Sequence, residues 1–183
     1  MSFGDGSIVA YAAAVYLRWL VSCKHASSAA CDGDYVSSLL TAKARVTPLS
    51  GLSIPRTEMN SMVLSTRLTL TSAKALSKEE SLHPVSAITL SDSECSISAV
   101  DKSTSSLKPY FHNRVSEVKE NLKAIGEICD TEEIFHIPRE LNIADLATHP
   151  GVRLSDLGPD SVWQTGPQFL SQEGTLASVQ KFC

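Results

Sequence analysis

The sequence predicts an α/β domain built on a mixed β-sheet. Short apolar, β-branched runs are interleaved with helical patterns, and the hairpin-like strands come first along the chain. The length of 183 residues suits one ordinary domain with its own hydrophobic core. We expect that domain over residues 1–150, with a C-terminal extension over residues 151–183 that packs on it or trails it.

The first half of the chain is predicted to hold three strand-like segments and one long helix. The second segment follows an Asp5-Gly6 turn signal and could form a buried strand or a short helix. The third segment ends before Pro48, and the helix opens with proline in its first turn. In order, the elements are strands at 1–4, 8–17 and 35–46, with a loop at 23–34 and the helix at 53–75.

The second half is predicted to alternate short strands with helices. A β-branched run between Pro84 and Ser91 suits a central strand buried on both faces. Apolar residues recur every three or four positions from Pro109, which indicates an amphipathic helix, and Asn142 is expected to cap a last helix. In order, the elements are a strand at 85–90, a short helix, a helix at 109–126, a strand at 134–137 and a helix from 143.

Composition and charge exclude several classes of protein. The formal net charge of −4 argues against a protein that holds nucleic acid mainly through a strong basic patch. The five cysteines are scattered and form no CxxC pair, so they indicate neither a zinc site nor a disulfide framework, and a reducing compartment is expected. The most apolar stretch is broken by Arg18 and is too short to span a bilayer, so we expect no membrane partner.

Four acidic residues lie at expected element boundaries: Asp5, Glu58, Asp92 and Asp145. Each has an ordinary structural explanation. Asp5 could start a turn, and Asp92 could cap a helix. Glu58 and Asp145 fall in predicted first turns of helices, where the helix dipole favours an acid.

Taken together, the four acids suggest a metal site. Strand ends and helix starts can converge at one edge of a mixed sheet, and clustered carboxylates repel one another unless a cation neutralises them. Oxygen ligands select magnesium or manganese over zinc. Two such ions can activate a water and stabilise the leaving oxygen in phosphodiester cleavage.

Six segments of the chain also carry a family resemblance. In order they are FGDGS with AYAAAVY, LTAKARVTP with IPRTEM, LSDS, NRVSE, IPRELNIADLA and WQTGPQFL, and they span nearly the whole chain. They resemble the ribonuclease H domain of a Bel/Pao-type LTR retrotransposon polyprotein. The resemblance implies a ribonuclease H-like fold, a mixed five-stranded sheet flanked by helices, with the first strand truncated here.

The resemblance implies an endonuclease that cuts the RNA strand of an RNA/DNA hybrid, with two Mg²⁺ ions as cofactors and Mn²⁺ as a substitute. The family's metal-binding carboxylates match Asp5, Glu58, Asp92 and Asp145. Asp5 and Asp92 would hold both metals. Glu58 would hold the metal nearer the leaving group, and Asp145 the metal at the attacking water. The implied partners are the hybrid and the reverse transcriptase domain of the same polyprotein, in the cytoplasm, a virus-like particle or the nucleus.

Weaker candidates for substrate contact come from basic and polar residues near these acids. A solvated charged surface is the better explanation for most of the basic ones. His136 falls inside a predicted strand, where a packed histidine is the better interpretation. His149 is closer to the last helix and could approach the metals, but an ordinary loop histidine explains it better. The substrate-binding candidates are Arg56, Asn60, Lys43, Arg114 and His149.

Two other functions stay open. A decayed or domesticated copy could keep the fold as a catalytically inactive binding or scaffold module. An integrase or transposase could use the same fold, but it would need a glutamate as its final acid, where this sequence has Asp145. Cleavage of hybrid but not of duplex DNA would separate the nuclease from the integrase.

Overall fold

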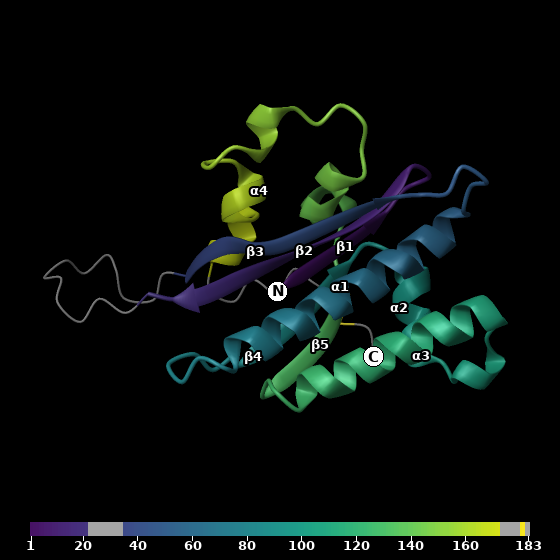
Figure 1. The fold of residues 1–183 in the computed structure, drawn as a ribbon, viewed down its shortest axis with the longest axis horizontal. Helices are drawn as coiled ribbons and strands as arrows, with labels where there is room; N and C mark the ends of the chain where they lie inside the picture. Colours follow the sequence, from purple (N-terminus) through teal and green to yellow (C-terminus); the bar gives the residue numbers. More distant parts are fainter. Residues whose placement is uncertain (22–34, 173–179, 182–183) are drawn as a thin grey trace, which may run out of the picture.

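The computed structural model describes residues 1–21, 35–172 and 180–181, which form a mixed sheet with helices packed on it (Figure 1). The strand order is β3-β2-β1-β4-β5-β6. The mixed five-stranded sheet with flanking helices is confirmed, and a two-residue sixth strand is added to it. The loop predicted at 23–34 lies outside the described residues. The strands are β1 (Ser2–Gly6), β2 (Ala10–Leu20), β3 (Tyr35–Val46), β4 (Ser86–Ser91), β5 (Thr131–His136) and β6 (Gln180–Lys181).

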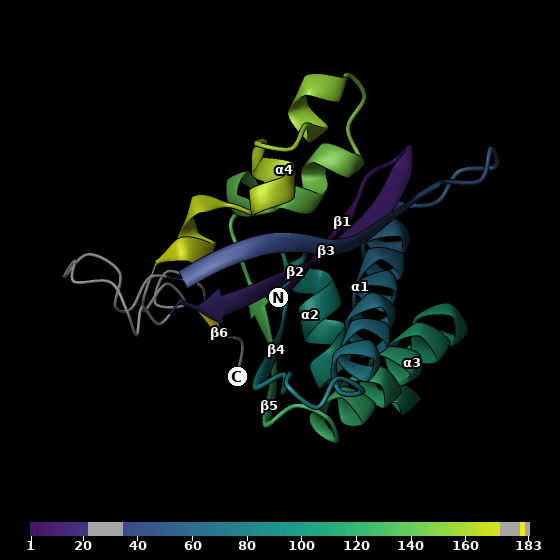
Figure 2. The same ribbon diagram turned by 60° about the vertical axis from the view of Figure 1, so that its left-hand side comes forward.

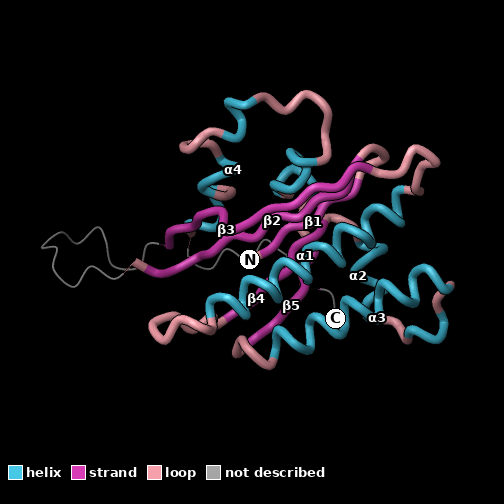
Figure 3. Tube along the Cα trace, in the orientation of Figure 1, coloured by secondary structure: helices cyan, strands magenta, loops and turns pink. Residues whose placement is uncertain are grey.

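β1 is the short central strand of this sheet. It pairs antiparallel with β2 and parallel with β4, while β2 also pairs antiparallel with β3. The segment that could have been a strand or a helix is therefore a strand, because it is hydrogen-bonded along both edges. β2 and β3 continue past the start of β1 (Figure 3). Met1, which directly precedes β1, forms two more hydrogen bonds with β2: its amino group donates to the carbonyl of Tyr16, and its carbonyl accepts from the N–H of Tyr16.

Helices cover both faces of the sheet. Figure 2 shows α1, α2 and α3 on one side, and α4 with neighbouring short turns on the other. Within the described residues, no helix is long and apolar enough to cross a membrane. The α-helices are α1 (Ile54–Leu76), α2 (Glu94–Asp101), α3 (Pro109–Gly126) and α4 (Val162–Thr165). The short 3₁₀ helices are η1 (Thr104–Ser106), η2 (Arg139–Leu141), η3 (Ile143–Ala147), η4 (Leu154–Leu157) and η5 (Gln168–Ser171).

The last predicted helix forms only as the 3₁₀ helix η3. Its cap is as expected, because the side chain of Asn142 accepts a hydrogen bond from the backbone N–H of Ala144. The helix stops at Thr148, whose N–H bonds to the carbonyl of Asp145 in the 3₁₀ pattern. Pro150 follows two residues later, and proline disfavours helix in the residue before it, His149.

Each face of the sheet has its own apolar core. On the α1 face, Met62 packs with residues of α2 and α3 such as Ile97 and Val118. On the other face, Phe3 and Tyr16 pack with residues of the C-terminal segment, including Trp163 and Leu170. The hydroxyl of Tyr16 donates a 2.7 Å hydrogen bond to the carbonyl of Trp163. The domain boundary at residue 150 remains a prediction.

Two glycines let β1 lie directly against the backbone of α1. A Cβ at Gly6 would lie 2.5 Å from the carbonyl carbon of Thr57 and would also meet the backbone nitrogen of Glu58. A Cβ at Gly4 would lie 3.1 Å from the carbonyl oxygen of Ser61. Because these obstacles are backbone atoms, no side-chain movement relieves them. The Phe-Gly-Asp-Gly sequence of β1 therefore sets how closely Asp5 approaches α1.

Replacing Gly6 by alanine should force β1 and α1 apart and lower the free energy of unfolding by about 3 kcal/mol or more, since overpacking with no room to relax is costly. Urea denaturation measures this change. Gly158→Ala is the matched control, because its nearest atom would lie 3.5 Å away. Equal stability of Gly6→Ala and Gly158→Ala would contradict the close packing.

Candidate active site

Asp5 and Asp92 lie at the carboxyl ends of two neighbouring parallel strands. The register between β1 and β4 runs up to the residue before each acid, so the two acids are neighbours across the sheet. Asp5 is a strand residue and does not start a turn; it is 7% exposed, and the hydroxyl of Thr148 donates to its Oδ2. Asp92 is partly buried, and its Oδ1 accepts a 3.0 Å hydrogen bond from Nδ2 of Asn142.

Glu58 approaches the same strand ends from α1. It lies beyond the first turn of that helix, so its expected first-turn position is wrong, and the helix dipole does not account for it. Its Oε2 accepts a 2.7 Å hydrogen bond from the hydroxyl of Ser93. Ser93 is also the residue that caps α2, since its Oγ accepts from the N–H of Ser96, so the cap role considered for Asp92 is wrong.

Asp145 lies in the first turn of η3, and both of its carboxylate oxygens have partners. Nε of Arg139 donates to Oδ1 at 3.3 Å, and Nδ1 of His149 lies 3.2 Å from Oδ2. Arg139 and His149 also contact each other, with 3.0 Å between a terminal guanidinium nitrogen and Nε2. A guanidinium can only donate, so Nε2 accepts and the ring proton of a neutral His149 lies on Nδ1, facing Asp145.

The four acids share one electrostatic environment. Burial raises the pKa of Asp5 most strongly, and the charges of Asp92 and Asp145 raise it further, while the Thr148 hydrogen bond opposes them. Burial also raises the pKa of Glu58, followed by the charges of Asp92 and Asp5. Asp5 is thus coupled to each of the other three acids. Repulsion of this kind within one small region is relieved by a bound cation.

The donor chemistry fits a divalent cation, but the side chains do not converge on one point. Carboxylates supply only hard oxygen ligands, which suit Mg²⁺ or Mn²⁺. Within residues 1–21, 35–172 and 180–181, however, no group of three or more His, Cys, Asp or Glu side chains is arranged to hold a metal ion. The carboxylates are turned toward partners within the protein. The residues that would hold the ions are Asp5, Glu58, Asp92 and Asp145.

Three of the substrate-binding candidates meet around Tyr110, at the start of α3. The guanidinium of Arg56 lies 4.7 Å from the centre of the Tyr110 ring, and that of Arg114 lies 5.3 Å from it. Asn60 Oδ1 accepts from the Tyr110 hydroxyl at 2.8 Å and from Nε of Arg114 at 3.2 Å. We call Arg56, Asn60, Tyr110 and Arg114 the arginine–tyrosine cluster.

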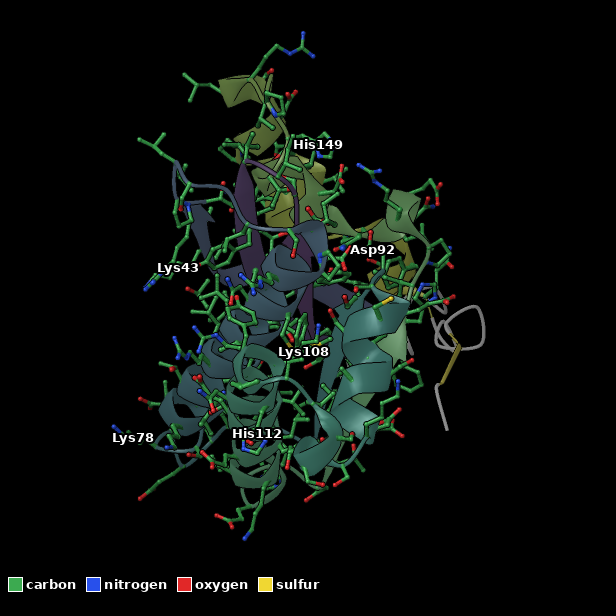
Figure 4. The ribbon with its side chains drawn as sticks, turned by 90° about the vertical axis from the view of Figure 1, so that its right-hand side faces the viewer. Lys43, Lys78, Asp92, Lys108, His112 and His149 are labelled. Carbon is green, nitrogen blue, oxygen red and sulfur yellow. The ribbon has the colours of Figure 1, made fainter. Side chains whose placement is uncertain are left out.

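The remaining candidates are dispersed. Figure 4 shows Lys43 projecting from the β3 side of the molecule, apart from Asp92 and His149, so it lies outside the acidic site. His149 contacts Asp145 directly. His136 lies at the end of β5, where its Nε2 is 3.2 Å from the backbone carbonyl of Asp92, a position that suits support of the strand end.

Sequence reasoning missed most of the side chains that hold the acids. The sequence pointed to Asn142 only as a helix cap, to Ser93 only as part of the LSDS segment, and to Thr148 not at all. Tyr110 was missed, although its spacing of four residues from Arg114 on a helix places the two on one face. That spacing was the available signal; the contacts to Asp5, Glu58 and Asp92 had none, because they join distant segments.

Asp92→Asn should stabilise the metal-free protein at neutral pH. The pKa values of Asp5 and Glu58 are raised in the folded state above their ordinary values of 3.8 and 4.5. Their contribution to stability is therefore fully present at pH values below the ordinary pKa and is lost as pH rises through the folded-state pKa. Removing the Asp92 charge reduces that loss by on the order of 1 kcal/mol. Urea unfolding with chelator at pH 3.5 and 7.5 measures it.

Asp160→Asn, which removes an exposed charge elsewhere, is the control. It should change stability little at either pH. The Asp92→Asn gain should be present at pH 7.5 and absent at pH 3.5. A loss of stability at pH 7.5, or an equal gain at both values, would contradict the coupling of the acids.

The comparison with family models agrees with the family resemblance. The family model described as Pao retrotransposon-like RNaseH-like domain matches residues 1–93. No curated protein matches the chain. The N-terminal RNase H domain of a Mycobacterium tuberculosis protein, solved fused to maltose binding protein, is similar at 14% identity and a TM-score of 0.47, covering 77% of this chain and 83% of its own. RNase H1 from the archaeon Halobacterium salinarum NRC-1 is similar at 13% identity and a TM-score of 0.43, covering 77% of this chain and 86% of its own.

From the family match, the chain belongs to the Pao retrotransposon-like RNaseH-like domains, a family whose fold supports a nuclease kind of enzyme.

Proposed function

We propose that this chain is a metal-dependent endonuclease that hydrolyses the RNA strand of RNA/DNA hybrids as part of a retrotransposon polyprotein. One observation carries the proposal, namely that the four acids gather at one strand end. The pairing of β1 with β4 places Asp5 beside Asp92, the contact of Gly6 with the backbone of Glu58 brings α1 to the same place, and Thr148, directly after η3, donates to Asp5. The ordinary explanations fail for three of these acids. Asp5 does not start a turn, Glu58 does not lie in the first turn of its helix, and Asp92 does not cap α2. Family membership supports the same chemistry.

The protein contributes a set of ligands with different degrees of freedom. Asp5 is fixed by the ladder of the central strand, and Asp92 by the hydrogen bond from Asn142. Glu58 is held by the hydrogen bond from Ser93. Asp145 lies on a short 3₁₀ helix, η3. When bound, two Mg²⁺ ions would activate a water and stabilise the leaving oxygen.

The arginine–tyrosine cluster is proposed to contact substrate phosphates. Arg56 and Asn60 are four residues apart on α1, the helix that also carries Glu58, and therefore share one face of it. Stacking against Tyr110 orders both guanidinium groups, whose remaining N–H donors suit phosphate oxygens. Selectivity for a hybrid would come from 2′-hydroxyls and groove shape, because base edges are not needed to tell RNA from DNA.

The acidic balance of the chain sets how the hybrid would be held. A net charge of −4 gives little long-range attraction for a polyanion. The bound cations and the neighbouring reverse transcriptase domain, the proposed partner in the polyprotein, would then supply most of the affinity.

The test is cleavage of a labelled RNA/DNA hybrid by the purified chain with Mg²⁺ or Mn²⁺. The wild-type protein should cut the RNA strand, and chelator should abolish cutting. Asp92→Asn should reduce the rate at least ~100-fold, because loss of a ligand should cost no less than loss of an outer-shell partner.

Asp92→Asn is a sharp control because the same variant is predicted to be the more stable protein at neutral pH. Lost activity then reports chemistry and not unfolding. Hybrid binding without a metal-dependent cut above this control would support the inactive scaffold module. Cutting of duplex DNA in place of the hybrid would support the integrase.

A further inference from the structure

Arg139 and His149, the two side chains that contact Asp145, have no role in the proposed reaction as described above. Arg139 lies in η2, six residues before Asp145, and His149 lies four residues after Asp145. Arg139 donates to Oδ1, and Nδ1 of His149 lies 3.2 Å from Oδ2 and 3.2 Å from the backbone carbonyl oxygen of Asp145. They are joined to each other through the guanidinium and Nε2.

The other acids are held differently. Asp5, Glu58 and Asp92 accept from the neutral groups of Thr148, Ser93 and Asn142, and each contact engages one carboxylate oxygen. Such contacts leave the second oxygen for a cation. Asp145 is the acid for which a full positive charge already stands beside the carboxylate and both oxygens are engaged.

We propose that Arg139 is a built-in counter-ion that takes the place of a metal at Asp145, and that a divalent cation binds this carboxylate only after displacing Arg139. The inference rests on the proposed function, because it assumes that Asp145 is a metal ligand. Arg139 is a positioning residue in this role, since it acts through Asp145.

The surroundings of Arg139 allow this displacement. Its side chain is 63% exposed, so the guanidinium is solvated once it leaves the carboxylate. A cavity of about 500 Å³ adjoins the pair and is lined by residues that include Arg139, Asp145, Leu146 and Pro167. The guanidinium therefore has both solvent and space into which to move.

The strength of the pair sets the size of the effect. Exposed ion pairs contribute little, and breaking one would change metal affinity by about two- to fivefold. The direction is the diagnostic feature. Damage to the site weakens metal binding, whereas loss of a competing cation strengthens it.

The test is calorimetric titration of the full chain with MnCl₂ and MgCl₂. Arg139→Gln should bind metal about two- to fivefold more tightly than wild type. The matched control is Arg153→Gln, which removes the same charge from an exposed pair with Asp156. Arg139→Lys keeps the charge but can reach only one of the two partners, so its affinity should lie between those of Arg139→Gln and wild type.

A second readout is the Nε–H signal of Arg139 in NMR spectra of arginine-labelled protein. Saturating Mg²⁺ should shift this signal in wild type, and the shift should be absent in Asp145→Asn. Unchanged or weaker binding by Arg139→Gln, or an equal gain in Arg153→Gln, overturns the proposal.

The result also separates this inference from the proposed function. If the wild-type chain cuts the hybrid and Arg139→Gln binds metal no more tightly, the counter-ion role alone is wrong. If the wild-type chain binds no divalent metal, or if Asp5→Asn leaves its metal binding unchanged, the counter-ion role and the metal-dependent nuclease are both wrong.

Discussion

The backbone contact between β1 and α1 is the constraint on which the rest of the site depends. Gly6 lies against the backbone of Thr57 and Glu58 at distances that leave no room for a Cβ, and Gly4 lies against Ser61, where a Cβ would be tightly packed. This contact places a strand acid, Asp5, beside a helix acid. The parallel pairing of β1 with β4 then adds Asp92, and the 3₁₀ helix η3 adds Asp145.

Bringing acids together in a chain that is already acidic requires compensation within the protein. Each carboxylate has a donor from another segment, and the donors are hydroxyl, amide and guanidinium groups, those of Thr148, Ser93, Asn142 and Arg139. These partners engage one oxygen each of Asp5, Glu58 and Asp92 and hold the acids in place without a cation. They also explain why the carboxylates are neighbours in space although their oxygens do not surround one point.

Local sequence signals predicted the elements well, but they could not predict contacts between distant elements. Proline at the start of α1, the apolar spacing of α3 and the Asn142 cap are local, and each was predicted correctly. The alanine-rich β2 was ambiguous, because its small residues suit a helix equally and only pairing with β1 and β3 decides for a strand. The Thr148–Asp5 and Ser93–Glu58 contacts join distant segments, so no spacing in the sequence encodes them.

The central claim is that acids from four elements form one divalent-cation site. It is tested most directly by a crystal structure of the chain soaked in Mn²⁺, with anomalous scattering used to locate the metal. The account predicts anomalous density between Asp5 and Asp92, with Glu58 and Asp145 turned toward it and Arg139 displaced. Absence of density there at saturating Mn²⁺, with the carboxylates still on their internal partners, would contradict the claim.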